Sequence, residues 1–195
     1  MLPTADICDK YPENTLVAKP IFKDFGGRTA FFGKAITLKT LDDNTKVRSS
    51  LESDGTNKGL VVDGEGSMNC ALLGGNLASI AVENNWSGII INGCVRDQLE
   101  IIVEKIGVKA LAAHPKKSIK NDGGEFNVTL NSEFTNTPPA AGLSFMAEKS
   151  PPSALNAPPI AIYLAVPDCS GREYLNASCR DCALIIILHK QTIKV

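Results

Sequence analysis

Short hydrophobic runs recur along the first two thirds of the chain, separated by glycine, aspartate and asparagine. Gly59–Asp63 and Gly88–Asn92 are apolar until a polar last residue, which is typical of strands buried on both faces. Further strands are predicted at Thr15–Ala18, Val108–Ala112 and Phe126–Leu130. Ala30–Thr40 alternates like a strand, with Ala30, Phe32, Ile36 and Leu38 on one face and only Lys34 interrupting it.

Helices are predicted between these strands. A capping threonine predicts a short helix over Thr4–Asp9, and Asp42–Thr45 predicts the start of a helix through about Ser53. The remaining predicted helices are Ser67–Leu73, Asn76–Asn84 and Gln98–Lys105, with Phe25–Arg28 as a turn and Gly93–Asp97 as a loop. Strands alternating with helices across short loops indicate a parallel α/β sheet, in which ligands bind beyond the carboxyl ends of the strands.

This pattern stops at about Asn131. The following segment is rich in proline, as in Ser150–Pro159, which is typical of linkers. Ile160–Val166 and Ala183–Leu188 are apolar enough for two strands, although the sequence shows no partner for them. We therefore divide the chain into residues 1–131, an α/β domain, and residues 132–195, an atypical tail.

Composition narrows the function. The 195 residues carry 20 basic and 21 acidic side chains, so the chain lacks the one-signed charge typical of nucleic-acid or membrane binding. Hydrophobic content of 44% is enough for a core, and no signal peptide or membrane-spanning run is visible. We expect a soluble, intracellular protein with reduced cysteines. A zinc site built from Cys169, Cys179, Cys182 and His189 is the alternative use of the cysteines.

Charged residues follow two of the predicted strands. Arg96 and Asp97 come after the strand ending at Asn92, and we expect them to point apart on their loop. The Arg96 guanidinium could then bind a carboxylate or an enolate oxygen, while Asp97 could bind Mg²⁺. An ordinary surface ion pair is the alternative interpretation. Asp63–Gly66 could add carboxylates, but a tight turn explains it better.

Gly74 and Gly75 interrupt the helical pattern before Asn76 and Leu77. They are either a helix break or a site where free backbone amides at a helix N-terminus bind an anion such as a carboxylate. His114 is interpreted as a strand-end residue, and Lys116 and Lys117 as part of a solvated loop. No Ser/His/Asp arrangement and no phosphate-binding loop is apparent.

Several motifs together resemble a known family. Gly75 is followed after twenty residues by Arg96-Asp97-Gln98-Leu99-Glu100, which fits the Gly-x20-Arg-Asp-x2-Glu/Asp pattern of the RraA-like family. Similar stretches are Phe25-Gly-Gly-Arg-Thr, Leu60-Val-Val-Asp-Gly-Glu-Gly-Ser, Ala71-Leu-Leu-Gly-Gly-Asn-Leu-Ala, Ile91-Asn-Gly-Cys-Val-Arg-Asp and Ile106-Gly-Val-Lys-Ala. The family includes class II 4-hydroxy-4-methyl-2-oxoglutarate aldolases and the regulator of ribonuclease E activity. The resemblance covers about residues 4–131.

The resemblance implies a swivelling β/β/α fold and a homotrimer with its site near the subunit interface. From the sequence itself we expect a cytoplasmic location. It also implies that Asp97 binds Mg²⁺ or Mn²⁺, that Glu100 orders a metal-bound water, and that Arg96 binds the pyruvoyl group. The backbone of Gly74, Gly75, Asn76 and Leu77 would hold the substrate carboxylate. The implied reactions are aldol cleavage of a small 2-oxo acid to pyruvate and decarboxylation of oxaloacetate through the same enolate.

Two points limit the resemblance. The rival function is a non-catalytic regulator that binds a ribonuclease, although the presence of both Asp97 and Glu100 favours the enzyme. The closing strands that the family normally has after Asn131 do not appear in residues 132–195. Their loss would leave sheet edges open unless the tail supplies substitutes.

Overall fold

The computed structural model describes residues 8–9, 12, 15–128, 161–164 and 184–187. Four parallel strands form its centre in the order β3-β4-β6-β7. Their bounds are β3 Phe31–Lys39, β4 Lys58–Asp63, β6 Gly88–Val95 and β7 Gly107–Ala113. The predicted βαβ parallel core is confirmed.

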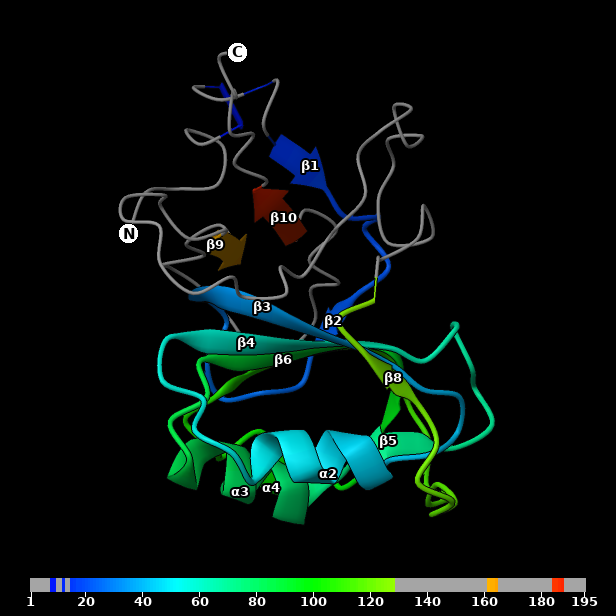
Figure 1. Cartoon of the computed structure of the whole chain (residues 1–195). Helices are drawn as coiled ribbons and strands as arrows, with labels where there is room; N and C mark the ends of the chain where they lie inside the picture. Colours follow the sequence, from blue (N-terminus) through cyan, green and yellow to red (C-terminus); the bar gives the residue numbers. More distant parts are fainter. Residues whose placement is uncertain (1–7, 10–11, 13–14, 129–160, 165–183, 188–195) are drawn as a thin grey trace, which may run out of the picture.

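Three helices cover one face of this sheet (Figure 1): α2 Thr45–Leu51, α3 Gly75–Glu83 and α4 Gln98–Ile101. Short strands extend the sheet, with β2 Lys23–Asp24 beside β7, β5 Ala71–Leu73 beside β6 and β8 Glu125–Phe126 beside β3. The helices therefore lie between the strands in sequence but on one side of them in space.

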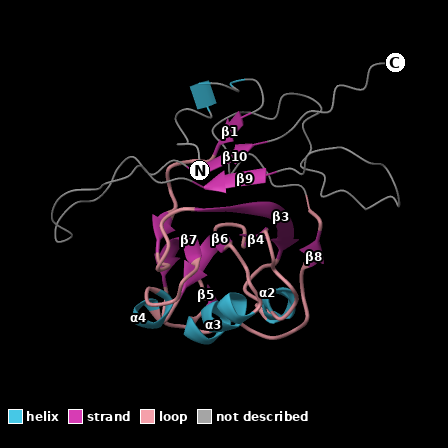
Figure 2. Ribbon diagram, turned by 90° about the vertical axis from the view of Figure 1, so that its left-hand side faces the viewer, coloured by secondary structure: helices cyan, strands magenta, loops and turns pink. Residues whose placement is uncertain are grey.

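The other face of the sheet is overlaid by strands from both ends of the described chain. These are β1 Thr15–Val17, β9 Ala161–Leu164 and β10 Leu184–Ile187. β9 pairs with β3, β10 with β9, and β1 with β10, all antiparallel. Figure 2 shows the resulting β/β/α layers, with β1, β10 and β9 farthest from the helices. Both strands predicted in the tail are thus present within their predicted ranges, and β9 pairs along one edge of β3.

Side-chain alternation divides the core in two. Leu60 and Val62 of β4 face the helices in the larger hydrophobic cluster, together with Leu51, Ile89 and Ile91. Val61 and Ile90 face the opposite side and pack with Phe31 and Phe22. Because both faces of β4 and β6 are buried, these strands are apolar nearly throughout, as their sequences predicted.

Some local predictions were wrong. Ser67–Leu73 is not a helix, since Ala71–Leu73 forms β5 and pairs with the end of β6. β6 continues through Gly93–Val95, which we predicted to be loop, and α4 ends at Ile101 rather than near Lys105. Phe32, which we grouped with Leu38 on one face of its strand, is 49% exposed, whereas Leu38 and, on the opposite face, Phe31 are buried. Of the predicted helix Thr4–Asp9, only residues 8–9 are described, and they are helical.

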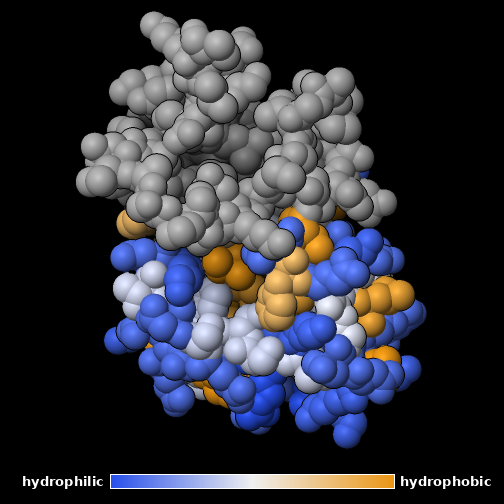
Figure 3. Space-filling view, viewed as in Figure 1, coloured by the Kyte–Doolittle hydropathy of each residue, from blue (hydrophilic) through white to orange (hydrophobic). Residues whose placement is uncertain are grey.

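The face of the described chain that is turned to the viewer in Figure 3 is mostly hydrophilic. Figure 3 shows apolar residues exposed on it in small, separate patches. Among the described residues, no helix has the length and apolar character needed to cross a membrane.

Candidate active site

Arg96 and Asp97 emerge where β6 ends. The Arg96 backbone N–H donates to the Leu73 carbonyl (2.9 Å), so the residue after β6 is tied to the end of β5. Gly74 and Gly75 follow β5 directly, and Gly75 begins α3. The strand pairing therefore brings together two segments that are twenty residues apart in the sequence.

Arg96 and Asp97 do not point apart as we expected. Their side chains form an ion pair, with Arg96 Nε 3.1 Å from Asp97 Oδ2. Asp97 has φ 56° and ψ 45°, the left-handed conformation, and is the N-cap residue of α4. Few non-glycine residues adopt this backbone conformation. In this conformation the Asp97 carboxylate lies against the loop that follows β5. Asp97 Oδ2 also accepts the Gly75 N–H at 3.4 Å.

The two glycines leave room for the acidic side chains. A methyl group on Gly74 would lie 2.7 Å from Asp97 Oδ2 and 3.1 Å from Arg96 Nε. A methyl group on Gly75 would lie within 3 Å of the Glu100 side chain, including its carboxylate. Glycine is thus needed at both positions for Asp97 and Glu100 to approach the start of α3.

The backbone amides at the start of α3 differ in availability. The Leu77 N–H donates to the Gly74 carbonyl (3.1 Å), so the expectation that this amide faces outward is wrong. The Asn76 N–H has no partner among the described residues, and Asn76 is exposed. The amide open to an anion is therefore that of Asn76, while Gly75 already faces Asp97.

Glu100 completes the cluster from the first turn of α4. Its backbone N–H donates to the Asp97 carbonyl (2.9 Å), which fixes the two acidic residues on one short turn. Its carboxylate is exposed and packs over Gly75. The structure thus gathers Arg96, Asp97 and Glu100 around Gly74 and Gly75, as the motif required.

The other candidates have structural roles. Asp63 is only 3% exposed, and its Oδ1 accepts the Asn92 side-chain N–H (3.1 Å) and the Glu65 backbone N–H (3.0 Å). This geometry supports the turn interpretation of Asp63–Gly66.

His114 follows β7, where its backbone N–H donates to the Val95 carbonyl and its Nδ1 accepts the Lys116 N–H (3.2 Å). Val95 of β6 pairs with Ala113 of β7. Arg96 and His114 are the residues that follow this pair, so they lie side by side where the two strands end. Sequence reasoning set His114 aside, and only this register relates it to Arg96.

The described cysteines are free. Burial raises the pKa of the Cys70 thiol to about 11, with the hydrogen bond to Asp42 adding to the effect. Burial also raises the pKa of Cys94. Both thiols are therefore protonated at neutral pH and unreactive. The proposed zinc ligands Cys169, Cys179, Cys182 and His189 lie outside the described residues.

Metal ligands are few in the described part of the chain. It contains no group of three or more histidine, cysteine, aspartate or glutamate side chains placed to hold an ion. The candidate site offers the carboxylates of Asp97 and Glu100. This set fits Mg²⁺ or Mn²⁺, which prefer oxygen ligands and retain several waters.

The sequence relatives decide the family. The family model described as RraA-like (Aldolase/RraA) matches residues 4–138. This chain belongs to the RraA-like family. It is 48% identical over 129 residues to a protein of Alkalilimnicola ehrlichii and 51% identical over 129 residues to one of Deinococcus radiodurans. Each alignment covers 66% of this chain and 80% of the relative, and each relative is named "Putative 4-hydroxy-4-methyl-2-oxoglutarate aldolase".

Solved structures share the fold under other functional names. The RNA-processing inhibitor RraA of Thermus thermophilis superimposes with a TM-score of 0.72 and 34% identity, covering 100% of this chain and 98% of that one. A protein of Geobacillus kaustophilus described as S-adenosylmethionine:2-dimethylmenaquinone methyltransferase gives 0.72 and 31%, covering 96% of each chain. One RraA-like fold thus carries several functional descriptions, and the site residues must decide among them.

Proposed function

We propose that this chain is a divalent-metal-dependent aldolase that cleaves 4-hydroxy-4-methyl-2-oxoglutarate to pyruvate. Decarboxylation of oxaloacetate is proposed as a secondary reaction, because it passes through the same pyruvate enolate. The observation that carries the proposal is the meeting of Arg96, Asp97 and Glu100 at Gly74 and Gly75. About half of the aligned positions are identical to proteins that bear this aldolase name.

Asp97 and Glu100 would hold the metal. Asp97 is proposed as the direct ligand and Glu100 as a residue that acts through an ordered water, with Mg²⁺ or Mn²⁺ as the ion. When bound, such an ion supplies a Lewis acid for the keto oxygen of the substrate. Asp97 Oδ2 already faces Arg96 and the Gly75 amide, whereas Oδ1 has no partner among the described residues.

Arg96 and the start of α3 would bind the pyruvoyl half of the substrate. The Asn76 amide lies at the positive end of a nine-residue helix and suits the substrate carboxylate. The ion pair through Nε of Arg96 would orient the guanidinium, whose other N–H groups would face the developing enolate oxygen. The proton taken up by the enolate carbon is proposed to come from water.

A homotrimer in the cytoplasm is part of the proposal. Leu99, Ile102 and Val103 lie on and just after α4, and they are 85%, 56% and 75% exposed. Three large apolar side chains exposed together beside the candidate site are suited to a subunit contact. That contact would place the site near the interface.

The second candidate function is a protein-binding regulator of ribonuclease E-type RNA processing. The likeness to the RNA-processing inhibitor RraA supports it. The presence of both Asp97 and Glu100 favours the enzyme, because a binding surface alone does not require two carboxylates directed at glycines. The two functions are compatible in one protein.

Asp97→Asn tests the aldolase. Asparagine tolerates the left-handed backbone, so the variant should fold while losing a charged metal ligand. We expect pyruvate formation with added Mg²⁺ or Mn²⁺ to fall about a hundredfold. Glu83→Gln, an exposed change on α3 away from the loop, is the control and should keep full activity. Unchanged activity in Asp97→Asn would refute the metal assignment.

The wild-type protein separates the two functions. If it forms no pyruvate with either metal but inhibits ribonuclease E cleavage of an RNA substrate, the regulator is correct.

A further inference from the structure

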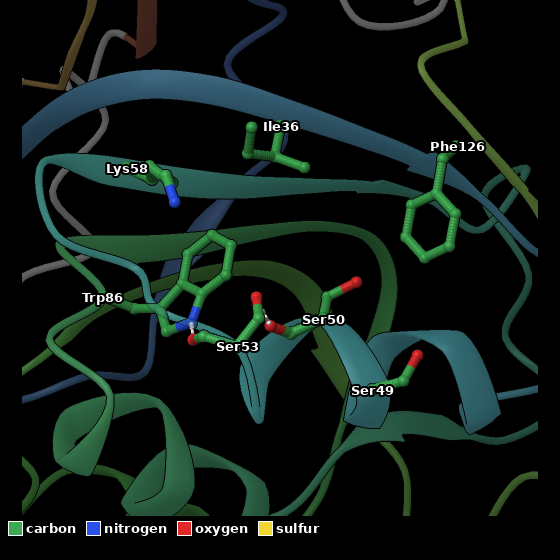
Figure 4. Close-up of a pocket in the computed structure, with 7 residues that line it drawn as sticks. All are labelled: Ile36, Ser49, Ser50, Ser53, Lys58, Trp86 and Phe126. Carbon is green, nitrogen blue, oxygen red and sulfur yellow. Dashed lines mark hydrogen bonds between the residues drawn. The ribbon is translucent and has the colours of Figure 1, made fainter.

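A cavity in the described part of the chain lies away from Arg96 and Asp97. It has a volume of about 250 Å³ and lies between α2 and the strands above it (Figure 4). Its lining residues are Ile36, Ser49, Ser50, Ser53, Lys58, Trp86 and Phe126. Trp86 precedes β6, whereas Arg96 follows it, so the eight residues of that strand, roughly 25 Å, separate the two places.

Trp86, Phe126 and Ile36 form the apolar walls of the cavity, and the wall at Trp86 is fixed. Trp86 is 4% exposed, its indole N–H donates to the Ser53 carbonyl (3.0 Å), and Gly55 packs against its ring. The indole therefore presents a ring surface with no free donor. In Figure 4 the Phe126 ring lies across the cavity from Trp86, and Ile36 points down between them. Phe126 is 45% exposed, which is unusual for a phenylalanine and leaves it free to contact a ligand.

The lower part of the cavity presents hydrogen-bond acceptors. The Ser49 and Ser50 hydroxyls both donate to the Lys46 carbonyl, at 3.2 and 2.7 Å, and the Ser53 hydroxyl donates to the Ser50 carbonyl (2.6 Å). Each hydroxyl proton is thus committed to the backbone, and the oxygen lone pairs remain. Figure 4 shows the Ser50 and Ser53 oxygens directed up into the cavity.

The local charge does not favour an anion. Lys58 is the cation of the cavity, and its Nζ already donates to the Asp54 carbonyl (2.6 Å) and lies 3.6 Å from the Asp54 carboxylate. The serines also belong to the C-terminal half of α2 and the turn after it, the negative end of the helix dipole. A carboxylate would therefore meet oxygen acceptors and an acidic neighbour.

We propose that this cavity binds a neutral, planar six-membered ring carrying one O–H or N–H donor, a phenol-like ligand. The ring would pack between Trp86, Phe126 and Ile36, and the donor would bond to a serine oxygen. The volume is at the small end for ligand sites and suits a single substituted ring. A ligand of this size binds with a dissociation constant on the order of 1 mM.

The test uses the chain's one tryptophan as its reporter. The full-length protein, labelled with ¹⁵N, is titrated with phenol, anisole or benzoate while the indole N–H resonance of Trp86 is followed. Anisole has the ring and the oxygen of phenol but no donor, and benzoate is an anion of similar size. We expect a saturable shift with phenol, binding of anisole weaker by roughly three- to tenfold, and no saturation with benzoate.

Variants separate the hydroxyl from the general shape of the cavity. Ser50→Ala should weaken phenol binding roughly three- to tenfold and leave anisole unchanged. Ser53→Ala, an exposed position, provides the same comparison if Ser50→Ala does not fold, which the dispersion of the spectrum will report. Equal affinities for phenol and anisole, tighter binding of benzoate, or no saturable shift with any probe would each overturn the proposal.

Discussion

Asp43 provides the sharpest stability prediction. It is 2% exposed and accepts four hydrogen bonds. Oδ1 accepts the backbone N–H and the hydroxyl of Thr45 (2.8 and 2.7 Å), and Oδ2 accepts the N–H groups of Asn121 and Gly123 (2.8 and 2.9 Å). Burial acts to raise the pKa of Asp43, but the hydrogen bonds outweigh it and lower the pKa from 3.8 to about 2.

This pKa shift sets the size of the effect. A fall from 3.8 to about 2 means that the ionised form stabilises the folded state by about 2 kcal/mol. Because the folded pKa is the lower one, this stability is fully present above about pH 4 and is lost as the pH falls towards 2. Asp43→Asn also places an amide N–H₂ against N–H donors. We therefore expect the free energy of unfolding to fall by about 2 to 4 kcal/mol at neutral pH.

Urea unfolding at pH 7 and at about pH 2.5 measures both quantities. Asp43→Asn should lower the free energy of unfolding at pH 7. It should also make that free energy differ less between pH 7 and about pH 2.5 than it does in the wild-type protein. Asp54→Asn is the matched control, because Asp54 binds the backbone and hydroxyl of Thr56 in the same local arrangement but is exposed and reaches no distant loop. If both variants lose the same stability, the bonds to the distant loop contribute nothing and the reasoning fails.

Three further predictions concern the sheet, the surface and a close backbone contact. Ile162→Pro removes a backbone hydrogen-bond donor from β9, which pairs with a strand on each side. It should lower the melting temperature, through a loss of about 3 kcal/mol in the free energy of unfolding. An unchanged melting temperature would show that β9 is dispensable. Leu99→Glu with Val103→Glu should leave the fold intact but lower the mass measured by light scattering, if α4 forms the proposed subunit contact. Gly26→Ala would place a methyl 2.2 Å from a backbone oxygen at the start of β7 and should cost about 2 kcal/mol or more in chemical unfolding, whereas Gly59→Ala, at 3.6 Å, should cost less.

The long apolar runs of the central sheet were predicted correctly, and the short run Ala71–Leu73 was not. Gly59–Asp63 and Gly88–Asn92 are apolar at consecutive positions, a pattern that few structures other than a buried strand explain. Ala71–Leu73 has only three apolar residues, too few to show either a helical or a strand periodicity. It forms a strand because it pairs with Cys94 and Val95, more than twenty residues later in the sequence. Phe32 does not share the burial of Leu38, because Phe31 on the opposite face is the phenylalanine that enters the core.

The sequence identified the residues that meet at the candidate site, but it did not predict their geometry. The spacing from Gly75 to Glu100 identified the residues, and pairing of β5 with β6 brings them together. The left-handed backbone of Asp97 and its ion pair with Arg96 are local geometry that residue spacing does not encode. Two of the hydrogen bonds of Asp43 were missed for a different reason, since their donors, the N–H groups of Asn121 and Gly123, lie 78 and 80 residues away.

The pairing of β1 with β10 has a consequence for synthesis of the chain. β1 comprises Thr15–Val17, and its partner β10 comprises Leu184–Ile187. During translation, the parallel strands from Phe31 to Ala113 can pair as they emerge, because their partners follow within a few dozen residues. β1 emerges before them but must wait for almost all of the sequence to be made. Binding by a chaperone or pairing with another nascent chain would compete for β1 during that interval.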